Sequence, residues 1–427
     1  RKPLPENLPR KDVIHDLSDA EKVCPHDGHA LTLIGEETSE QLDVIPQQVQ
    51  VIRHIRRKYA CPQCEQGVTV APLPPQPIPK SLASPGTLAF VTTNKFVDGL
   101  PLYRQETLFK RLNIDISRAT LANWVIRAGQ LIQPLIDRLA RELLTGRLIH
   151  MDETTLQVLK EPERPATSQS WLWVRRGGPP EKGIVLFDYD PHRNQAVPKR
   201  LLAGFTGTLV TDGYEAYAPV VRENGMTHAG CWAHARRKFN DALKVQGTQA
   251  KGKAGKAMEA MSFIRQLYAV ERQAKEKHLD PEQRHALRQQ QSRPVIERTR
   301  RWLDKSMRQV PPKSVLGKAM GYLDKQWDKL TGFLDDGLIP LDNNPAENAI
   351  RPFVIGRKAW LFADTVHGAE ASANLYSLVE TAKANGLEPY RYLRHVFTHL
   401  PAAQSPEQID ALLPTRVDAG MINAIPL

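Results

Sequence analysis

The spacing of apolar residues changes along the chain, and these changes predict its secondary structure. Residues 84–145 carry Leu, Ile and Trp at helical spacing, with a short break at 113–116. Further on, short apolar runs are separated by Pro, Gly and Ser, which predicts three consecutive strands at 147–159, 170–176 and 183–190. The elements expected next are a helix at 193–203, a strand at 207–213, a short helix at 214–223 and a strand or strand–helix junction at 227–239.

The rest of the chain is mainly helical. Residues 240–335 are polar and basic, and they are interrupted by the flexible run "GTQAKGKAGK" and by Pro311 and Pro312. A last group of helices begins at Pro345 and continues to about residue 399. Consecutive strands followed by alternating helices and strands predict a mixed α/β sheet with helices on its faces. We therefore expect 240–335 to be a helical insertion in that unit.

The N-terminal part of the chain has a different character. Residues 1–20 are expected to be extended, and residues 21–70 form a small module bounded by "CPHDGH" and "CPQC". The β-rich run "QVQVIRHIRRKYA" leads into the second of these motifs. Five prolines in residues 71–80 predict a stiff, extended linker, so a domain boundary is expected within 71–83.

The charge of the chain favours a polyanionic partner. Lys and Arg number 58 against 47 Asp and Glu, which leaves a formal net charge of +11 at pH 7. The basic residues gather in short runs at 53–58, 234–238, 251–256 and 297–301. Nucleic acid is the first candidate for such a partner, although any single run is also typical of a solvated protein surface.

The cysteine count and the apolar runs favour a cytoplasmic location. The four cysteines are too few and too unevenly placed for a disulfide framework. No apolar run reaches the roughly 18 residues that a membrane span needs. The first thirty residues are rich in proline and charge, unlike a signal peptide. We therefore expect a protein of the reducing cytoplasm with no membrane partner.

Two aspartates occupy positions that invite a chemical explanation. Asp152 lies inside a predicted strand, where an unpaired buried charge is costly. Its neighbour Glu153 points to the opposite face of the strand, so only one of the two can serve a given site. Asp212 ends the run "GTLVTD" before Gly213, where an ordinary turn residue is also expected.

The segment "LDNNPAENAIRP" at 341–352 allows two interpretations of Glu347. Asn344 fits a helix N-cap and Pro345 the first helical position, so that Glu347 stands third, where a capping-box carboxylate reaches back to the backbone. Alternatively, Glu347 joins the two aspartates as a ligand of two divalent ions, which need several hard oxygen ligands. The two interpretations compete for the same oxygens.

Five motifs in order resemble the transposases of the insertion-sequence-66 family, which are bacterial DDE transposases. The motifs are "HMDETTLQV", "TDGYEAY", "GCWAHARRKF", "DNNPAENAIRPFVIGRKAWLFADT" and "ETAKANGLEPYRYLRHV". The resemblance runs from the cysteine module to "ALLP" at 411–414 and so covers nearly the whole chain. It implies DNA transposition and recombination in the bacterial cytoplasm, at the nucleoid.

The resemblance also implies a multidomain α/β architecture. A ribonuclease-H-like catalytic core with a mixed sheet would occupy 146–239 and 336–375, with the helical insertion at 240–335 and a helical tail at 376–427. The DDE motif would be Asp152, Asp212 and Glu347, which would bind two Mg²⁺ or Mn²⁺ ions. The strand order predicted from the apolar pattern agrees with this arrangement.

The cysteine module is a candidate zinc site. Cys61 and Cys64 have the spacing of a zinc knuckle, and Cys24 opens a matching turn. The resemblance implies a four-cysteine zinc finger here, yet Asp27 stands where the second cysteine of the first pair is expected. A loss of zinc is the alternative to a replaced ligand. The candidates for the fourth ligand are Asp27, His26 and His29.

Cys231 and His234 stand three residues apart, just before three consecutive cations. This spacing resembles the Cys-x-x-His element that several DDE transposases carry between their second and third acids. Such a pair alone is more often a packing feature than a zinc site, because zinc needs four ligands. We interpret it as support for the active site, or as a DNA-facing element.

Residues 102–130, within the helical region 84–145, predict a helix-turn-helix with Ser117 as the N-cap of its second helix. An ordinary helical hairpin in the core is the alternative. A contact between Arg351 and DNA also has an alternative. Arg351 stands four residues after Glu347 on the expected helix, so the two side chains could form an ion pair with each other. The candidate DNA contacts are Arg118, Thr120, Asn123, Arg127, Arg236, Arg237, Arg351, Arg357, Lys358 and Trp360.

Three functions are compatible with the sequence. The first is a transposase that cuts at the terminal inverted repeats of its element and joins the 3′ hydroxyls to target DNA. The second is a metal-dependent nuclease of the same fold without strand transfer, and the third is a DNA-binding regulator with a decayed core. The presence of all three acids argues against decay. Joining two ends implies a homodimer or higher oligomer on DNA, and the resemblance implies accessory transposition proteins as partners.

Overall fold

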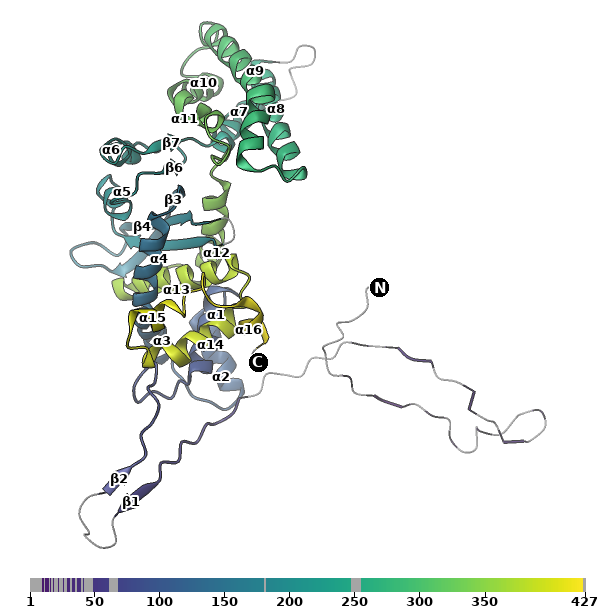
Figure 1. The fold of residues 1–427 in the computed structure, drawn as a ribbon, viewed down its shortest axis with the longest axis vertical. Coiled ribbons are helices and arrows are strands. Elements are labelled where there is room, and N and C mark those ends of the chain that lie inside the picture. Colours follow the sequence, from purple (N-terminus) through teal and green to yellow (C-terminus); the bar gives the residue numbers. More distant parts are fainter. Residues whose placement is uncertain are drawn as a thin grey trace. The chain divides into compact units, whose positions relative to one another are not determined.

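The computed structural model describes residues 49–60, 68–179, 182–246 and 255–424, together with scattered positions before residue 49 (Figure 1). The chain divides into two units, Arg1–Leu73 and Pro74–Leu427. The boundary between the units falls within the proline-rich segment 71–80, which the sequence predicts to be a stiff linker.

In the first unit, β1 (Lys58–Ala60) and β2 (Val68–Val70) pair in antiparallel fashion. Arg56 Nε donates a hydrogen bond to the Ala71 carbonyl oxygen at 2.6 Å beside this pair. Of the β-rich run expected to lead into "CPQC", only the last three residues form a strand within the described part. The predicted zinc ligands Cys24, Asp27, Cys61 and Cys64 lie outside the described residues, so the zinc site stays a prediction.

Four helices precede the sheet in the second unit: α1 (Pro85–Phe96), α2 (Leu102–Arg111), α3 (Arg118–Leu131) and α4 (Gln133–Leu144). The Ser84 hydroxyl caps α1 by accepting the Thr87 N–H, and the Ser117 hydroxyl caps α3, as predicted, by accepting the Thr120 N–H. The predicted break is the turn between α2 and α3. Asn113 there takes a left-handed conformation (φ 59°), which asparagine tolerates better than most residues.

A six-stranded mixed sheet follows. Its strands are β3 (Leu148–Lys160), β4 (Gln169–Gly177), β5 (Ile184–Asp190), β6 (Thr208–Val210), β7 (Thr227–Ala229) and β8 (Ala363–Thr365). The strand order is β5-β4-β3-β6-β7, and β8 pairs with the far end of β3. β4 runs antiparallel to both β3 and β5, whereas β6 and β8 run parallel to β3, and β7 runs parallel to β6. The predicted mixed α/β sheet is thus confirmed.

The elements after β5 are helices and strands where the sequence predicts them, but their lengths differ from the prediction. The strand predicted at 207–213 ends at Val210, because the chain then turns: Asp212 Oδ1 accepts the Tyr214 N–H, and Gly213 has a φ of 92°. The helices expected around it are α5 (Ala196–Leu201), η1 (Glu215–Tyr217) and α6 (Ala218–Glu223). The predicted junction at 227–239 is β7 followed by α7 (Trp232–Gln246).

The predicted helical insertion contains α8 (Lys256–Glu276), α9 (Pro281–Met307), α10 (Val315–Lys325), α11 (Trp327–Thr331) and η3 (Gly332–Leu334). These helices share an apolar core with α7, in which Trp232 and Phe239 are fully buried. The buried guanidinium of Arg288 on α9 forms a bidentate pair with Glu271. It also donates to the carbonyl oxygens of Phe333, Asp336 and Ile339, and so fixes the chain that returns to the sheet.

The chain ends in a group of helices: α12 (Asn344–Trp360), α13 (Val366–Ala384), α14 (Pro389–His399), η4 (Leu400–Ala402), α15 (Pro406–Asp410) and α16 (Ala419–Ala424). α12 packs on β3 and β4, and α13 packs on β5 and α3, whereas α11 and η3 contact β7 at the other edge of the sheet (Figure 1). Among the described helices, none is both long and apolar enough to cross a membrane.

Candidate active site

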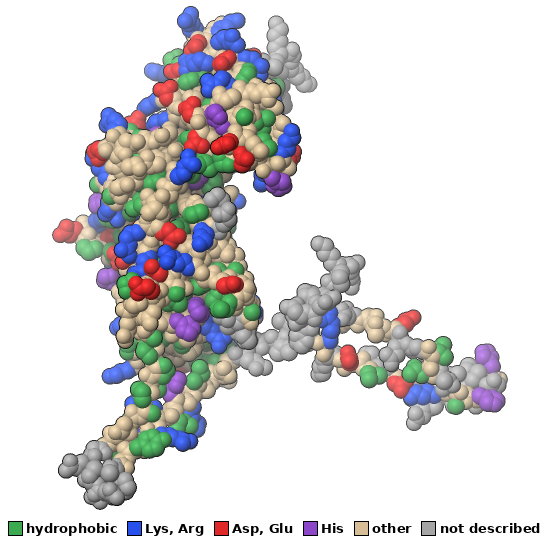
Figure 2. All heavy atoms as spheres, viewed as in Figure 1, with side chains coloured by type: hydrophobic (Ala, Val, Ile, Leu, Met, Phe, Trp, Pro, Cys, Tyr) green, Lys and Arg blue, Asp and Glu red, His purple; other side chains and the backbone are tan. Residues whose placement is uncertain are grey.

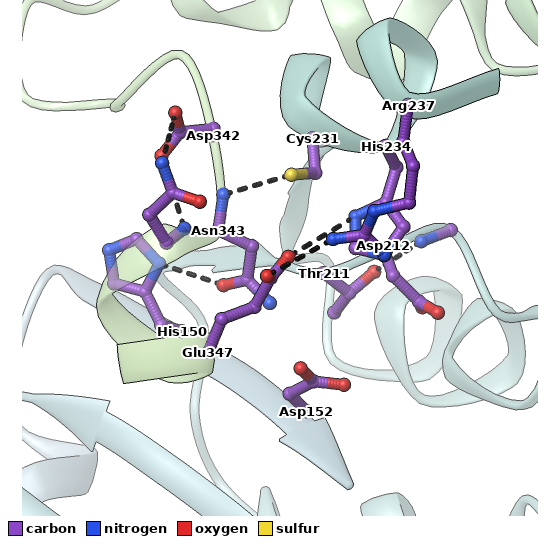
Figure 3. Close-up of polar contacts among 12 residues, drawn as sticks. His150, Asp152, Thr211, Asp212, Cys231, His234, Arg237, Asp342, Asn343 and Glu347 are labelled. Atoms are coloured by element: carbon purple, nitrogen blue, oxygen red, sulfur yellow. Dashed lines mark hydrogen bonds and ion pairs between the residues drawn. The ribbon is translucent and has the colours of Figure 1, made fainter. Parts of the chain in front are cut away.

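Asp152 lies on β3, just beyond the stretch that pairs with β6. That pairing ends with His150 opposite Val210, so Asp152 lies beside the loop that continues β6. Figure 3 shows its carboxylate directed towards the region of Asp212 and Glu347. Burial, together with the charges of Glu153, Asp212 and Glu347, raises the pKa of Asp152 to about 8. Acids that oppose one another's ionisation in this way would be stabilised by a divalent cation.

Glu153, the neighbour of Asp152, has partners within the protein for both of its oxygens. Its side chain is 1% exposed, and it accepts hydrogen bonds from Arg193 Nε at 2.7 Å and from the Tyr217 hydroxyl at 2.6 Å. Arg193 in turn lies over the ring of Tyr214, 4.0 Å from its centroid. Among the described residues, Asp152 accepts a hydrogen bond only from the Glu153 N–H, at 2.9 Å. Asp152 is therefore the better placed of the two to bind a ligand.

Asp212 follows β6 in a tight turn. One of its carboxylate oxygens has the role of an ordinary turn residue, as the sequence allowed. Its Oδ1 accepts the Tyr214 N–H at 2.8 Å, and its carbonyl oxygen accepts the Tyr322 hydroxyl at 2.8 Å. The buried Thr211 hydroxyl accepts the Gly213 N–H and hydrogen-bonds His228 Nε2 at 2.8 Å. Within the described part of the chain no hydrogen bond reaches Asp212 Oδ2, which therefore stays available to a ligand.

The helix that carries Glu347 begins one residue earlier than the sequence predicts, which corrects the proposed capping. The N-cap is Asn343, and neither it nor Asn344 caps the helix with its side chain. Asn343 is fully buried, and its side chain is committed to β3: Nδ2 donates to the Met151 carbonyl oxygen at 3.0 Å, and Oδ1 hydrogen-bonds His150 Nδ1 at 2.9 Å. Asp342 Oδ1 accepts the Asn344 N–H instead, at 3.1 Å.

The Glu347 carboxylate faces α7 and forms no capping box. Its Oε2 lies 3.3 Å from Arg237 Nη2, and its Oε1 lies 3.6 Å from His234 Nδ1. Burial lowers the pKa of His234, although the charges of Asp212 and Glu347 oppose that shift. Within the described residues, both Glu347 Oε1 and His234 Nδ1 are buried without a hydrogen-bond partner. Such orphaned polar atoms are rare, and they are typical of a site that a ligand completes.

The oxygen donors of the three acids fit a hard divalent cation, whereas the Cys231–His234 pair does not fit zinc. The Cys231, His234 and Glu347 ligand atoms lie within 4.8 Å of one another, which is one ligand short of a tetrahedral zinc site. Moreover, Cys231 is buried and its Sγ accepts the Asn343 N–H at 3.2 Å, and burial raises the pKa of its thiol to about 11. Cys231 therefore connects the start of α7 to the start of α12 (Figure 3).

The candidate DNA contacts beyond Glu347 divide into two groups. Arg351 and Lys358 are exposed, and Arg351 forms no ion pair with Glu347 in the described structure. The Arg357 guanidinium donates to the Thr155 carbonyl oxygen and hydroxyl and so ties α12 to β3. Trp360 packs edge-on against Phe353, at 5.3 Å between ring centroids. The side chains of Arg357 and Trp360 thus make contacts within the protein, whereas those of Arg351 and Lys358 are exposed.

The remaining candidates lie on α3 and α7. Arg118, Asn123 and Arg127 are exposed on α3, whose other side packs against α13 so closely that a Cβ on Gly129 would lie 2.6 Å from the Ala371 backbone. Arg236 and Arg237 are exposed on α7. The structure thus leaves these cations open to solvent.

Sequence reasoning missed three residues that shape the site. Asn343 and His150 lock α12 onto β3, and Tyr322 holds the backbone of Asp212. His150 carries a weak signal, because it stands two residues before Asp152 and so shares its strand face. The other two contacts join residues 192 and 110 positions apart, which no local pattern encodes.

Three family models match the chain. "Transposase IS66 family" matches residues 80–371, "zinc-finger binding domain of transposase IS66" matches 21–65, and "IS66 C-terminal element" matches 377–415. The second match covers the module in which the sequence predicts zinc.

Similar curated proteins come from Sinorhizobium fredii (strain NBRC 101917 / NGR234). Uncharacterized protein y4jD is 34% identical over 426 residues, which cover 96% of this chain and 81% of that protein. Uncharacterized protein y4qI is also 34% identical, over 97% of this chain and 78% of its own length. Together with the match of the family model to most of the chain, these similarities establish that the protein belongs to the IS66 transposase family.

Proposed function

We propose that this protein is a DDE transposase that cleaves DNA at the ends of its insertion sequence and joins the 3′ hydroxyls to target DNA. One observation carries the proposal. Asp152 from β3, Asp212 from the loop after β6 and Glu347 from α12 lie near one another, and burial together with the charges of Glu153, Asp212 and Glu347 raises the pKa of Asp152 to about 8. Convergent acids of this kind, on separate elements of one core, are typical of metal-dependent phosphoryl transfer.

The strand order supports a ribonuclease-H-like core. Three antiparallel strands followed by two parallel ones, in the order β5-β4-β3-β6-β7, place the first acid on the central strand and the second after its parallel neighbour. On this proposal the core comprises 146–239 and 336–375, the insertion 240–335 and the helical tail 376–427. The zinc module at 21–70 and the helical region 84–145 would bind DNA.

Each residue of the site has a role in the proposed reaction. Two Mg²⁺ or Mn²⁺ ions bound by Asp152, Asp212 and Glu347 would activate water or a 3′ hydroxyl and stabilise the leaving oxygen. Arg237 holds the Glu347 carboxylate from outside, at 3.3 Å, and is exposed enough to contact a phosphate as well. Asn343 holds the first turn of α12 against β3, which fixes where Glu347 projects.

Charge on the surface supports DNA as the partner. On the face drawn in Figure 2, Lys and Arg side chains are numerous over the insertion helices, with Asp and Glu interspersed. Phosphates on the transposon end and the target would be attracted to these cations and to Arg351 and Lys358, which are exposed on α12. Synapsis of two ends would require at least a dimer on DNA, with accessory transposition proteins as further partners, in the bacterial cytoplasm.

An Asp212→Ala protein tests the proposal against its two alternatives. We expect full-length wild-type protein to cut DNA that carries the ends of the element in the presence of Mg²⁺, and to join pre-cut ends to a target. The Asp212→Ala protein should do neither, while it still binds the ends. Cleavage without joining by the wild type would favour a nuclease of the same fold. Undiminished cleavage by Asp212→Ala would overturn the proposed site.

A further inference from the structure

Two tyrosines of the helical insertion contact the segments that carry Asp212 and Glu347. Tyr322, on α10, donates its hydroxyl hydrogen to the Asp212 carbonyl oxygen at 2.8 Å. Tyr268, on α8, donates to Asp342 Oδ2, also at 2.8 Å. Each contact joins residues that are far apart in the chain, so each is a property of the way the insertion packs on the sheet.

The Tyr322 contact fixes the turn that orients Asp212. Within that turn, Asp212 Oδ1 accepts the Tyr214 N–H, and Gly213 has a positive φ of 92°. Gln326, which follows α10, lies against the same glycine, where an added Cβ would be 2.9 Å from Gln326 Cδ. The end of α10 therefore restrains the backbone on both sides of the Asp212–Gly213 peptide bond.

The Tyr268 contact acts on the start of α12. The Asp342 carboxylate that accepts the Tyr268 hydroxyl also accepts the Asn344 backbone N–H at 3.1 Å and Asn344 Nδ2 at 2.8 Å. Asn344 is the first residue of α12, and Glu347 lies in its first turn. Because Asp342 satisfies a donor at the helix start, Tyr268 fixes the residue that determines where α12 begins.

The basic run of α7 places a cation against each tyrosine. Lys238 Nζ lies 4.7 Å from the ring centroid of Tyr322, and Arg236 Cζ lies 6.0 Å from that of Tyr268. Burial raises the pKa of both tyrosine hydroxyls, and both donate their hydrogen in these contacts. The middle cation, Arg237, contacts Glu347 itself. One turn of α7 thus meets both tyrosines and the third acid.

We propose that Tyr322 and Tyr268 are positioning residues, Tyr322 for Asp212 and Tyr268 for the start of α12 and hence Glu347. The insertion then holds two of the three acids in the geometry that binds metal. This inference rests on the proposed function, because it concerns what orients the acids of that same site.

A Tyr322→Phe protein tests the inference, because it removes the hydroxyl and keeps the ring against Lys238. Tyr392→Phe is the matched control: the buried Tyr392 hydroxyl on α14 also donates to a carbonyl oxygen, that of Leu412, at 2.8 Å. We expect Tyr322→Phe to lower the cleavage rate about tenfold, since small displacements of catalytic groups have effects of this order. Mn²⁺ binding, followed by electron paramagnetic resonance, should weaken several-fold, while affinity for end DNA stays within about twofold of wild type.

The outcomes separate this inference from the proposed function. Tyr322→Phe that binds Mn²⁺ and cleaves like Tyr392→Phe would overturn the positioning role, even if the wild type is an active transposase. Wild-type protein that cleaves no DNA would count against the proposed function, and the Mn²⁺ measurement would still decide the role of Tyr322. Tyr268→Phe provides an independent second variant, for which we expect the same pattern with a smaller loss, because it acts through Asp342.

Discussion

The strand that carries Asp152 and the two segments that carry Asp212 and Glu347 position their carboxylates in different ways. β3 has thirteen residues and pairs with β4 over most of its length and with β6 and β8 at its two ends, so the sheet itself fixes Asp152. Asp212 lies in a turn after a strand of three residues, and Glu347 lies in the first turn of a helix. Those two acids depend on single side-chain contacts, namely those of Tyr322, Asn343 and Arg237.

This difference suggests that the site is assembled from a rigid part and an adjustable part. A ladder of backbone hydrogen bonds tolerates most side-chain changes, whereas single side-chain contacts are lost with one substitution. Substitutions at the contacts of Asp212 and Glu347 should therefore lower activity, whereas substitutions at comparable contacts elsewhere should not. The following variants test that expectation, from the largest expected effect to the smallest.

Glu347→Gln should abolish cleavage while α12 and DNA binding persist. The amide keeps the size of the side chain and removes the charge that a divalent ion needs, so we expect a loss of about a thousandfold or more in the cleavage rate. Glu370→Gln, at an exposed acid of α13 that faces His367, is the control and should cleave normally. Circular dichroism and end binding should match wild type in both. Cleavage that survives in Glu347→Gln would mean that Glu347 is only a helix-start residue.

Asn343→Ala should reduce both stability and activity. It leaves the Met151 carbonyl oxygen and buried His150 without their partner, which costs about 1–3 kcal/mol of unfolding free energy. Burial lowers the pKa of His150 to about 4, so the freed ring would not be rescued by protonation at neutral pH.

Asn385→Ala is the matched control for Asn343→Ala, because its amide donates to two carbonyl oxygens, those of Gly183 and Thr381, away from the acids. Urea denaturation should show a loss of stability in both variants, whereas cleavage at a temperature where both are folded should fall about tenfold or more only in Asn343→Ala. Equal activity in the two would show that Asn343 stabilises the fold without orienting Glu347.

Lys358→Ala should weaken DNA binding slightly and leave chemistry intact. Loss of one phosphate contact reduces the slope of log affinity against log salt by about one. Lys383→Ala is the control, because that lysine is already paired with Glu380 on α13 at 2.8 Å. Filter binding across a range of salt concentrations measures the slope. An unchanged slope in Lys358→Ala would place the DNA path elsewhere on the surface.

The sequence predicted the parts of the fold that local patterns encode. β3 to β5 follow from apolar runs separated by turn residues, and the Ser117 cap follows from its hydroxyl before a helical pattern. The start of α12 was placed one residue late, because Asn343 has the same capping chemistry as Asn344 and only the fold shows that its side chain binds β3.

For the candidate site, the sequence singles out only the three acids. The resemblance assigns Asp152, Asp212 and Glu347 to one site, and the structure brings them together. The groups that orient them could not be predicted, since the Tyr322–Asp212 and Arg237–Glu347 contacts each span 110 residues. Contacts over such distances depend on the packing of α7, α8 and α10, which carries no local sequence signal.

The most direct test of the proposed site is a crystal structure of the full-length protein with end DNA and Mn²⁺, with the ions located by anomalous scattering. We expect two Mn²⁺ ions bound by the carboxylates of Asp152, Asp212 and Glu347. The absence of any ion among these three residues, with DNA bound nearby, would contradict the proposal.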